Sequence, residues 1–124
     1  MNDMWQFNVT SQQWKWVSGD ITTGYKPSVY GVQGVSGASN VPCGRGSHAA
    51  DFAFGSIKLY MFGGINQGEL NDLWVYDYAT QWWTFITRGT TSVTPSSPYP
   101  GARTGHAFLA LPGGPLFAMV TYSP

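Results

Sequence analysis

The two histidines, His48 and His106, are the side chains of this sequence best suited to acid–base or metal chemistry. Each follows an arginine by three positions, Arg45 and Arg103, so the two histidines stand at equivalent places in a repeated pattern. A metal site would need a third and a fourth ligand, and Asp51 is the only acidic residue within a few positions of either histidine. We therefore expect no bound metal and no cofactor.

Other signatures of catalysis are missing from the sequence. It contains no GxxxxGK phosphate-binding loop, CxxC pair, GxSxG nucleophile motif or HExxH helix. Its single cysteine, Cys43, excludes a disulfide within the chain. Six Lys and Arg residues balance six Asp and Glu residues, so no field of one sign would attract nucleic acid or an anionic membrane. These observations predict a protein that is not an enzyme.

The amino end carries no recognisable targeting signal. MNDMWQFNVT has no basic region followed by an apolar run, and no later stretch is apolar enough to span a bilayer. We therefore expect neither a signal peptide nor a transmembrane segment, with a cytoplasmic location as the default. The compartment otherwise stays open.

The composition favours β-structure, because aromatic residues make up 16% of the chain, charged residues only 10%, and glycines number 16. Strands are predicted at 47–54 and 57–62 around a tight Gly-Ser turn, and at 72–78 and 82–86 around a short polar turn. The segment IKLYMF is almost continuously apolar, which is typical of a strand covered on both faces. No helical period competes, so we expect an all-β protein.

Two segments of the sequence occur twice. NDMWQFNVTSQQWKWVSG begins at position 2 and NDLWVYDYATQWWTFITR at position 71, an offset of 71 − 2 = 69 that places Trp5 on Trp74 and Trp14 on Trp83. The segments that contain His48 and His106 match at an offset of 106 − 48 = 58. Aromatic residues that recur at matched positions are expected to pack in a core.

One stretch between these repeats has a specific order of residues. It begins with Arg45 and His48, continues with LYMFGG and NDLWVYD, and ends in a tryptophan pair. This order resembles one complete repeat of the kelch family. The resemblance implies a partial kelch-type β-propeller built from four-stranded antiparallel blades. Its structural signature positions would be Gly63, Gly64, Trp74 and Trp83.

The resemblance divides the chain into five parts. Residues 1–20 would form the second half of one blade, and residues 45–89 a complete blade. Residues 103–124 would form the first half of a degenerate blade, because TYSP stands where a Gly-Gly pair should follow LFAMV. Residues 21–44 and 90–102 would be loops between blades.

Some kelch proteins are enzymes, and their catalytic residues can be compared with this sequence. Enzymes that resemble galactose oxidase need a copper site of two tyrosines and two histidines, with a cysteine bonded to one tyrosine. Cys43 lies in a predicted loop between blades, and no matching set of ligands is visible. The resemblance therefore carries no catalytic residue over to this chain.

Strand reversal predicts two separable ends of the molecule. In a four-stranded meander the two hairpin turns emerge at one end, and the other connections emerge at the opposite end. The hairpin turns at 55–56, 79–81 and 112–114 are short, whereas the other connections are long and mix aromatic with polar groups. The alternative is that these are simply solvated loops. The binding residues expected at this loop end are Tyr25, Tyr30, Arg45, Asn66, Arg88, Tyr99 and Arg103.

These features leave several functions open. The first is a protein-interaction or scaffolding module that binds a protein through the loop end. The alternatives are a carbohydrate-binding or carbohydrate-modifying propeller fragment, and a truncated gene product without independent function. About two blades would leave apolar faces uncovered, so we also expect a homo-oligomer, in which three copies would supply about six blades.

Overall fold

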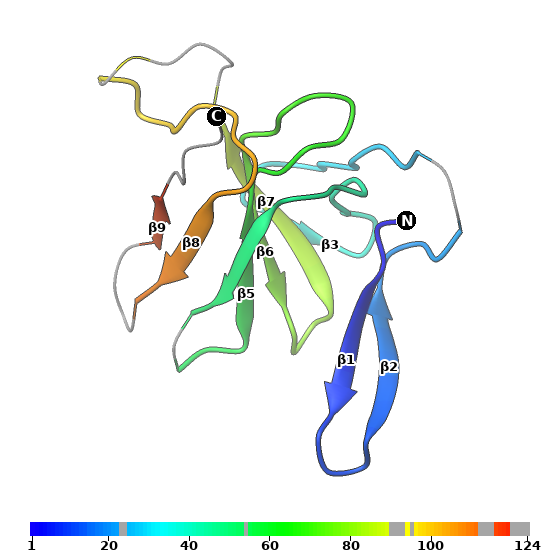
Figure 1. The fold of residues 1–124 in the computed structure, drawn as a ribbon. Helices are drawn as coiled ribbons and strands as arrows, with labels where there is room; N and C mark the ends of the chain where they lie inside the picture. Colours follow the sequence, from blue (N-terminus) through cyan, green and yellow to red (C-terminus); the bar gives the residue numbers. More distant parts are fainter. Residues whose placement is uncertain (23–24, 54, 90–93, 95, 112–115, 120–124) are drawn as a thin grey trace.

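The computed structural model describes residues 1–22, 25–53, 55–89, 94 and 96–111, together with the backbone of 116–119. These residues form β-strands and no helix, which confirms the all-β prediction (Figure 1). None of them forms an apolar helix of the length that a bilayer requires. The strands are β1 Met4–Asn8, β2 Gln13–Ser18, β3 Ser36–Gly37, β4 Ala49–Phe52, β5 Lys58–Phe62, β6 Asp72–Asp77, β7 Trp82–Arg88, β8 Ala107–Ala110 and β9 Leu116–Met119.

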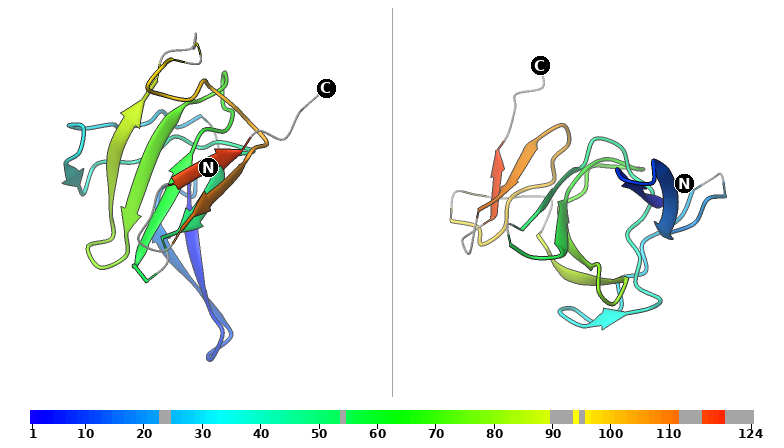
Figure 2. Two further views of the ribbon diagram at one scale, coloured as in Figure 1. Left: turned by 90° about the vertical axis from the view of Figure 1, so that its left-hand side faces the viewer. Right: turned by 90° about the horizontal axis from the view of Figure 1, so that it is seen from below.

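The strands make three antiparallel sheets. The central sheet has five strands in the order β3-β7-β6-β5-β4, and the hairpins β1–β2 and β8–β9 are separate two-stranded sheets. The two hairpins lie on opposite sides of the central sheet (Figure 2). The sheets that the structure describes do not close into a ring. All-β architecture with antiparallel meanders is therefore the fold of this chain.

Residues 25–44, part of the predicted loop 21–44, contain a short strand and a β-bridge. In the strand, β3, Ser36 pairs with Thr84 of β7, and the bridge joins Val29 and Val41. The Asn40 amide holds the segment in place, because it donates to the backbone carbonyls of Val35 and Trp83. The prediction missed this strand because Ser36 and Gly37 carry no apolar alternation.

The strand bounds repeat with the offsets found in the sequence. Subtracting 69 from the bounds of β6 and β7 gives 3–8 and 13–19, against 4–8 and 13–18 for β1 and β2. The same irregularity of pairing occurs between Leu73 and Trp74 and between Met4 and Trp5. Adding 58 to the bounds of β4 gives those of β8. The chain is thus built from recurring hairpins.

The turns of the repeated hairpins also match. Gln12 and Gln81 have φ angles of 57° and 61°, and their amides donate to Asn8 and Asp77 at 2.8 Å in both turns. The side chains of Asn8 and Asp77 accept from amides two residues later, which stabilises each turn. A short polar turn of this kind fixes the register of the hairpin that it joins.

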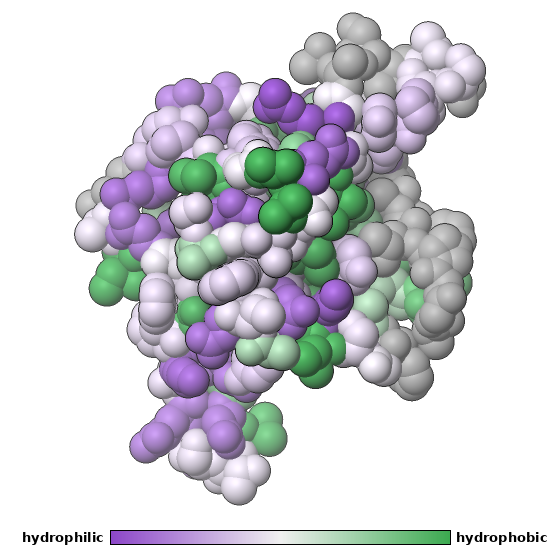
Figure 3. Space-filling view, turned by 180° about the vertical axis from the view of Figure 1, so that it is seen from behind, coloured by the Kyte–Doolittle hydropathy of each residue, from purple (hydrophilic) through white to green (hydrophobic). Residues whose placement is uncertain are grey.

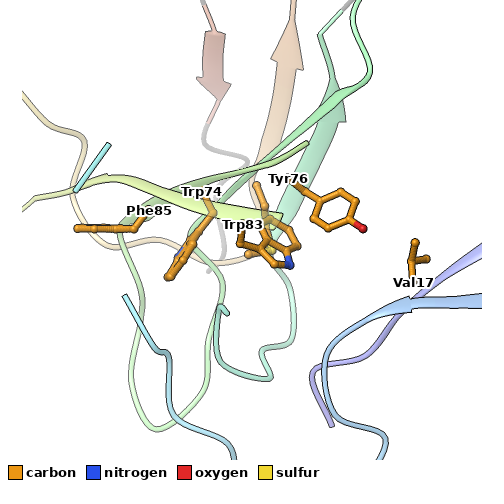
Figure 4. Close-up of a cluster of buried hydrophobic side chains, with 6 residues drawn as sticks. Val17, Trp74, Tyr76, Trp83 and Phe85 are labelled. Carbon is orange, nitrogen blue, oxygen red and sulfur yellow. The ribbon is translucent and has the colours of Figure 1, made fainter. Parts of the chain in front are cut away.

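An aromatic core lies between the central sheet and the hairpin β1–β2. Trp74 and Tyr76 from β6 and Trp83 and Phe85 from β7 are buried, and Val17 of β2 faces them (Figure 4). The ring centroids of Tyr76 and Trp83 are 5.1 Å apart, and those of Trp74 and Phe85 are 5.5 Å apart. This packing is the main hydrophobic stabilisation visible in the chain.

The matched aromatic residues of the hairpin behave differently. Trp5 and Trp14 are 47% and 65% exposed, whereas Trp74 and Trp83 are buried. The expectation that matched aromatics all pack in a core is therefore wrong for β1–β2. The physical reason is that no described segment covers the hairpin face that carries Trp5 and Trp14.

The connections separate to two ends of the molecule. The turns β1–β2, β4–β5 and β6–β7 lie at the lower end in Figure 1, and the described parts of the other connections, 25–48, 63–71 and 96–106, lie at the upper end. The predicted turn at 112–114 lies outside the described residues. The upper end is called the loop end below.

Candidate binding site at the loop end

A hollow of about 670 Å³ opens at the loop end of the central sheet. Its walls come from three connections that are far apart in the sequence: the segment before β3, the segment before β6 and the segment after β7. Tyr30, Arg88 and Tyr99, three of the residues predicted to bind, line it together. The other lining residues are Glu69, Leu70, Asn71, Asp72 and Gly89.

Tyr30 is the rigid wall of this hollow. Its ring stacks on Trp74 with centroids 5.2 Å apart and meets the edge of Phe85 at 4.8 Å. The Arg88 guanidinium lies 5.1 Å from the centre of the same ring, a cation–π arrangement that orients the charge over the hollow. Burial, and then the nearby charge of Asp72, raise the pKa of the Tyr30 hydroxyl, so it stays protonated at neutral pH.

Asp72 forms the floor of the hollow, and it is held in a buried ion pair by Arg45, which does not line the hollow. The side chains of Arg45 and Asp72 are each 2% exposed, and Arg45 Nη2 donates to Asp72 Oδ2 at 2.9 Å. The same carboxylate accepts from the Trp74 indole at 2.8 Å and from the Tyr30 hydroxyl at 3.2 Å. Burial by itself would raise the pKa of Asp72, but the hydrogen bond and charge of Arg45 lower it below its usual value. The floor is therefore ionised and fully paired.

One expectation from the sequence is corrected by this pair. Arg45 was expected on the recognition surface, yet its guanidinium is buried and also donates to the Gly63 carbonyl at 3.0 Å. Asp72, the first residue of β6, binds three side chains. The reason is that Arg45 precedes β4 and Asp72 begins β6, and the meander brings both residues to the loop end.

The other predicted binding residues lie outside the hollow. The Asn66 amide donates to the Gly44 carbonyl and so ties two connections together. The half-buried Arg103 donates from Nε to the Gly101 carbonyl at 3.0 Å. Tyr25 is 57% exposed and does not line the hollow. Asn71 and Gly89 do line it, and the signal that could have found them is their position directly before β6 and after β7.

The glycine pair has a packing role in the described structure. Gly63 and Gly64 end β5 with φ angles of 62° and 96°. A Cβ atom on Gly63 would lie 2.7 Å from the Arg103 carbonyl oxygen and 2.8 Å from Cε1 of His106. Gly64 donates to that same carbonyl at 2.9 Å. The pair thus lets the segment before β8 approach the end of β5 closely.

The two histidines do not form a common site with acidic or thiol ligands. No group of three or more His, Cys, Asp and Glu side chains comes together among the described residues. His106 is buried against the edge of Phe62, with ring centroids 5.3 Å apart, and its burial and the charge of Arg103 lower its pKa. Comparison of the chain with protein-family models and with curated proteins finds no match in either set.

Proposed function

We propose that this chain is a non-catalytic protein-interaction module and that it binds its partner through the hollow at the loop end. The observation that carries the proposal is the convergence of Tyr30 from before β3, Arg88 at the end of β7 and Tyr99 from after β7 into one hollow, which the segment before β6 also lines. In simply solvated loops we would expect neither a tyrosine stacked on the core nor an arginine placed over its ring. Binding sites in proteins are commonly concave and supported by a rigid framework of this kind.

The side chains of the hollow suit a protein partner. Tyrosine and arginine are the residue types that carry the most binding energy at protein interfaces. Glu69 and Arg88 offer both signs of charge at the rim, while Tyr99 offers a ring that is 41% exposed. The ion pair of the floor is already satisfied, so it serves as a support and the rim would make the contacts.

The proposal includes the kelch-type fold. It is supported by the order of residues from Arg45 to Trp83, by the four-stranded meander β4–β7 and by the matched hairpins at offsets of 69 and 58 residues. Strands β4–β7 would be one blade, and β1–β2 and β8–β9 would be parts of its neighbours. A closed propeller would need further blades beyond those of one chain.

A selected peptide ligand would test the binding site. Peptides are selected from a display library on the intact chain, and their affinity is measured by isothermal titration calorimetry. We expect Arg88→Ala and Tyr99→Ala each to weaken binding by about tenfold or more, the loss typical of a hot-spot residue. The matched control is Tyr25→Ala, because Tyr25 is an exposed tyrosine outside the hollow.

The same chain and variants distinguish the proposed function from its alternatives. A peptide whose affinity falls in Tyr25→Ala but is unchanged in Arg88→Ala and Tyr99→Ala would overturn the proposal. Binding on a glycan array that depends on Tyr99, with no peptide selected, would support the carbohydrate-binding alternative. An insoluble chain without a cooperative unfolding transition would support the truncated gene product.

A further inference from the structure

One face of the hairpin β1–β2 carries four exposed aromatic side chains. Trp5 pairs with Trp16 across the two strands, and Phe7 pairs with Trp14, with ring centroids of the second pair 5.0 Å apart. All four are between 43% and 65% exposed. The tip of the hairpin stands clear of the body of the molecule (Figure 3). An exposed aromatic patch of this kind marks an interaction surface. We call these four residues the aromatic face.

The chain itself contains a covered copy of this face. At the offset of 69 residues the aromatic face corresponds to Trp74, Tyr76, Trp83 and Phe85, which are the buried core. Met4 and Val17, from the opposite side of the hairpin β1–β2, pack against that core. In this structure the opposite side of the hairpin that comes earlier in the chain therefore covers such a face.

The equivalents of the covering residues are present in the central sheet. The same offset takes Met4 to Leu73 and Val17 to Ile86, both half-buried on the side of β6–β7 opposite the core. Leu73 lies in an apolar groove of about 360 Å³. Phe62, Thr87, Tyr99, Pro100 and Phe108 also line this groove. This side of the sheet, with Leu73 and Ile86, is called the back face below.

We propose that the chain binds a second copy of itself head to tail, with the aromatic face of one copy seated on the back face of the other. The strand edges fit the same arrangement. In the central sheet β5 pairs with β6, and the equivalents of these strands are β9 and β1. Both β9 and β1 have one edge without a strand partner among the described residues. A docked copy would therefore extend the β8–β9 sheet with its own β1.

The argument favours a second copy over an unrelated partner. Leu73 and Ile86 of the back face match Met4 and Val17, which already pack against the buried core of the same chain. Because the two faces differ, the interface is heterologous, so association continues until a ring closes or a filament forms. Tyr99 lines both the loop-end hollow and the groove of the back face, whereas Arg88 lines only the hollow, so Arg88 is the residue that separates the two sites.

Self-association can be measured by sedimentation velocity over a range of concentrations of the intact chain. We expect reversible association that Trp14→Glu weakens by about thirtyfold or more, the effect of losing a central interface tryptophan. Val9→Glu is the matched control, because Val9 is 81% exposed in the hairpin turn and off the aromatic face. Arg88→Ala should associate as the unaltered chain does. A chain that stays monomeric at every concentration overturns the proposal.

Mixing two variants tests the head-to-tail geometry. Leu73→Glu damages the back face and Trp14→Glu the aromatic face, so each alone should be monomeric and their mixture should form a dimer that grows no further. Far-ultraviolet circular dichroism checks that both fold, and Ile86→Glu replaces Leu73→Glu if that variant unfolds. Full association of a folded Leu73→Glu or Ile86→Glu chain would show that aromatic faces meet each other, which contradicts the proposal.

Discussion

At the scale of single residues, the buried pair of Arg45 and Asp72 organises the loop end. It joins the start of the segment before β4 to the start of β6, and Asp72 also binds Tyr30 and Trp74. Breaking a buried pair leaves one charge without a partner, which costs more than the pair itself contributes. The pair would therefore support the proposed binding site from below.

We expect Asp72→Ala to lower the free energy of unfolding by about 3–5 kcal/mol. The control is Lys58→Met, which removes the exposed contact of Lys58 with Asp77 at 3.8 Å and should cost less than about 1 kcal/mol. Urea unfolding followed by tryptophan fluorescence measures both. Equal losses in the two variants would show that the buried pair has no special weight.

His106 gives the stability a pH dependence of known sign. Its pKa is lowered in the folded chain from an ordinary value of 6.5, chiefly by burial. The neutral form is therefore favoured by folding, so its stabilising contribution is complete above pH 6.5 and declines as the pH falls toward the lower folded pKa. The pKa of Asp72 is also lowered, but from 3.8, so its contribution is lost only in stronger acid.

We expect the melting temperature to fall between pH 7.5 and pH 5, and His106→Gln to reduce that fall. The pKa of the exposed His48 is also lowered, by desolvation and by the charge of Arg45, so His48→Gln measures the separate share of this histidine in the fall. Differential scanning calorimetry at several pH values measures the effect. A melting temperature that rises on acidification would contradict the assignment.

At the scale of elements, the two copies of the hairpin provide a natural comparison. Trp83 and Trp14 occupy matched positions, yet Trp83 is 5% exposed and Trp14 is 65% exposed. The residue is a tryptophan at both positions, whereas its surroundings differ. Any difference in the effect of substitution therefore reports packing.

We expect Trp83→Ala to cost about 3–5 kcal/mol of folding free energy and Trp14→Ala less than about 1 kcal/mol. Denaturant unfolding at a protein concentration low enough to keep the chain monomeric measures both values. Tyr99→Ala should resemble Trp14→Ala, because Tyr99 is 41% exposed. Similar losses at Trp83 and Trp14 would mean that core and surface are wrongly assigned.

The end of β5 depends on its glycines. Gly63→Ala would force a side chain into a left-handed conformation and against the Arg103 carbonyl, so we expect a loss larger than the 1–2 kcal/mol of the conformation alone, about 3 kcal/mol in total. Gly34→Ala is the matched control, since Gly34 has a φ of 76° and no atom within 4 Å of its added Cβ. Thermal unfolding compares the two, and equal losses would contradict close packing at Gly63.

At the scale of the whole molecule, stability is expected to be uneven. The central sheet carries the aromatic core, whereas β1–β2 and β8–β9 are two-stranded, and each of their strands is paired on one edge only among the described residues. Isolated hairpins are marginally stable in water. The association proposed for the aromatic face would protect these hairpins in the same way that β1–β2 protects the core.

We expect hydrogen exchange in a dilute, monomeric sample to be slowest in β5, β6 and β7 and faster in β1 and β2. Raising the protein concentration should slow exchange in β1 and β2 selectively, because binding to the folded form stabilises what it covers. The Trp14→Glu variant should lack this response. Uniform protection of all the strands at low concentration would contradict the uneven stability.

Local chemistry in the sequence was enough to determine the all-β class, the hairpin turns at 55–56 and 79–81 and the repeat at offsets of 69 and 58 residues. Turn residues and strand-forming aromatics act over a few positions, so they can be recognised without knowing the neighbours. The same reasoning missed β3, because Ser36 and Gly37 become a strand only through pairing with β7.

Tertiary structure alone decided which of the matched residues are buried. Trp14 and Trp83, or Arg45 and Arg103, are alike in sequence, but only Trp83 is covered by a hairpin and only Arg45 meets a buried carboxylate. It also decided that Tyr30, Arg88 and Tyr99 share one hollow and that Tyr25 does not. The physical reason is that burial and convergence depend on segments distant in the chain, whose approach is set by packing of the whole molecule and has no signal in any one of them.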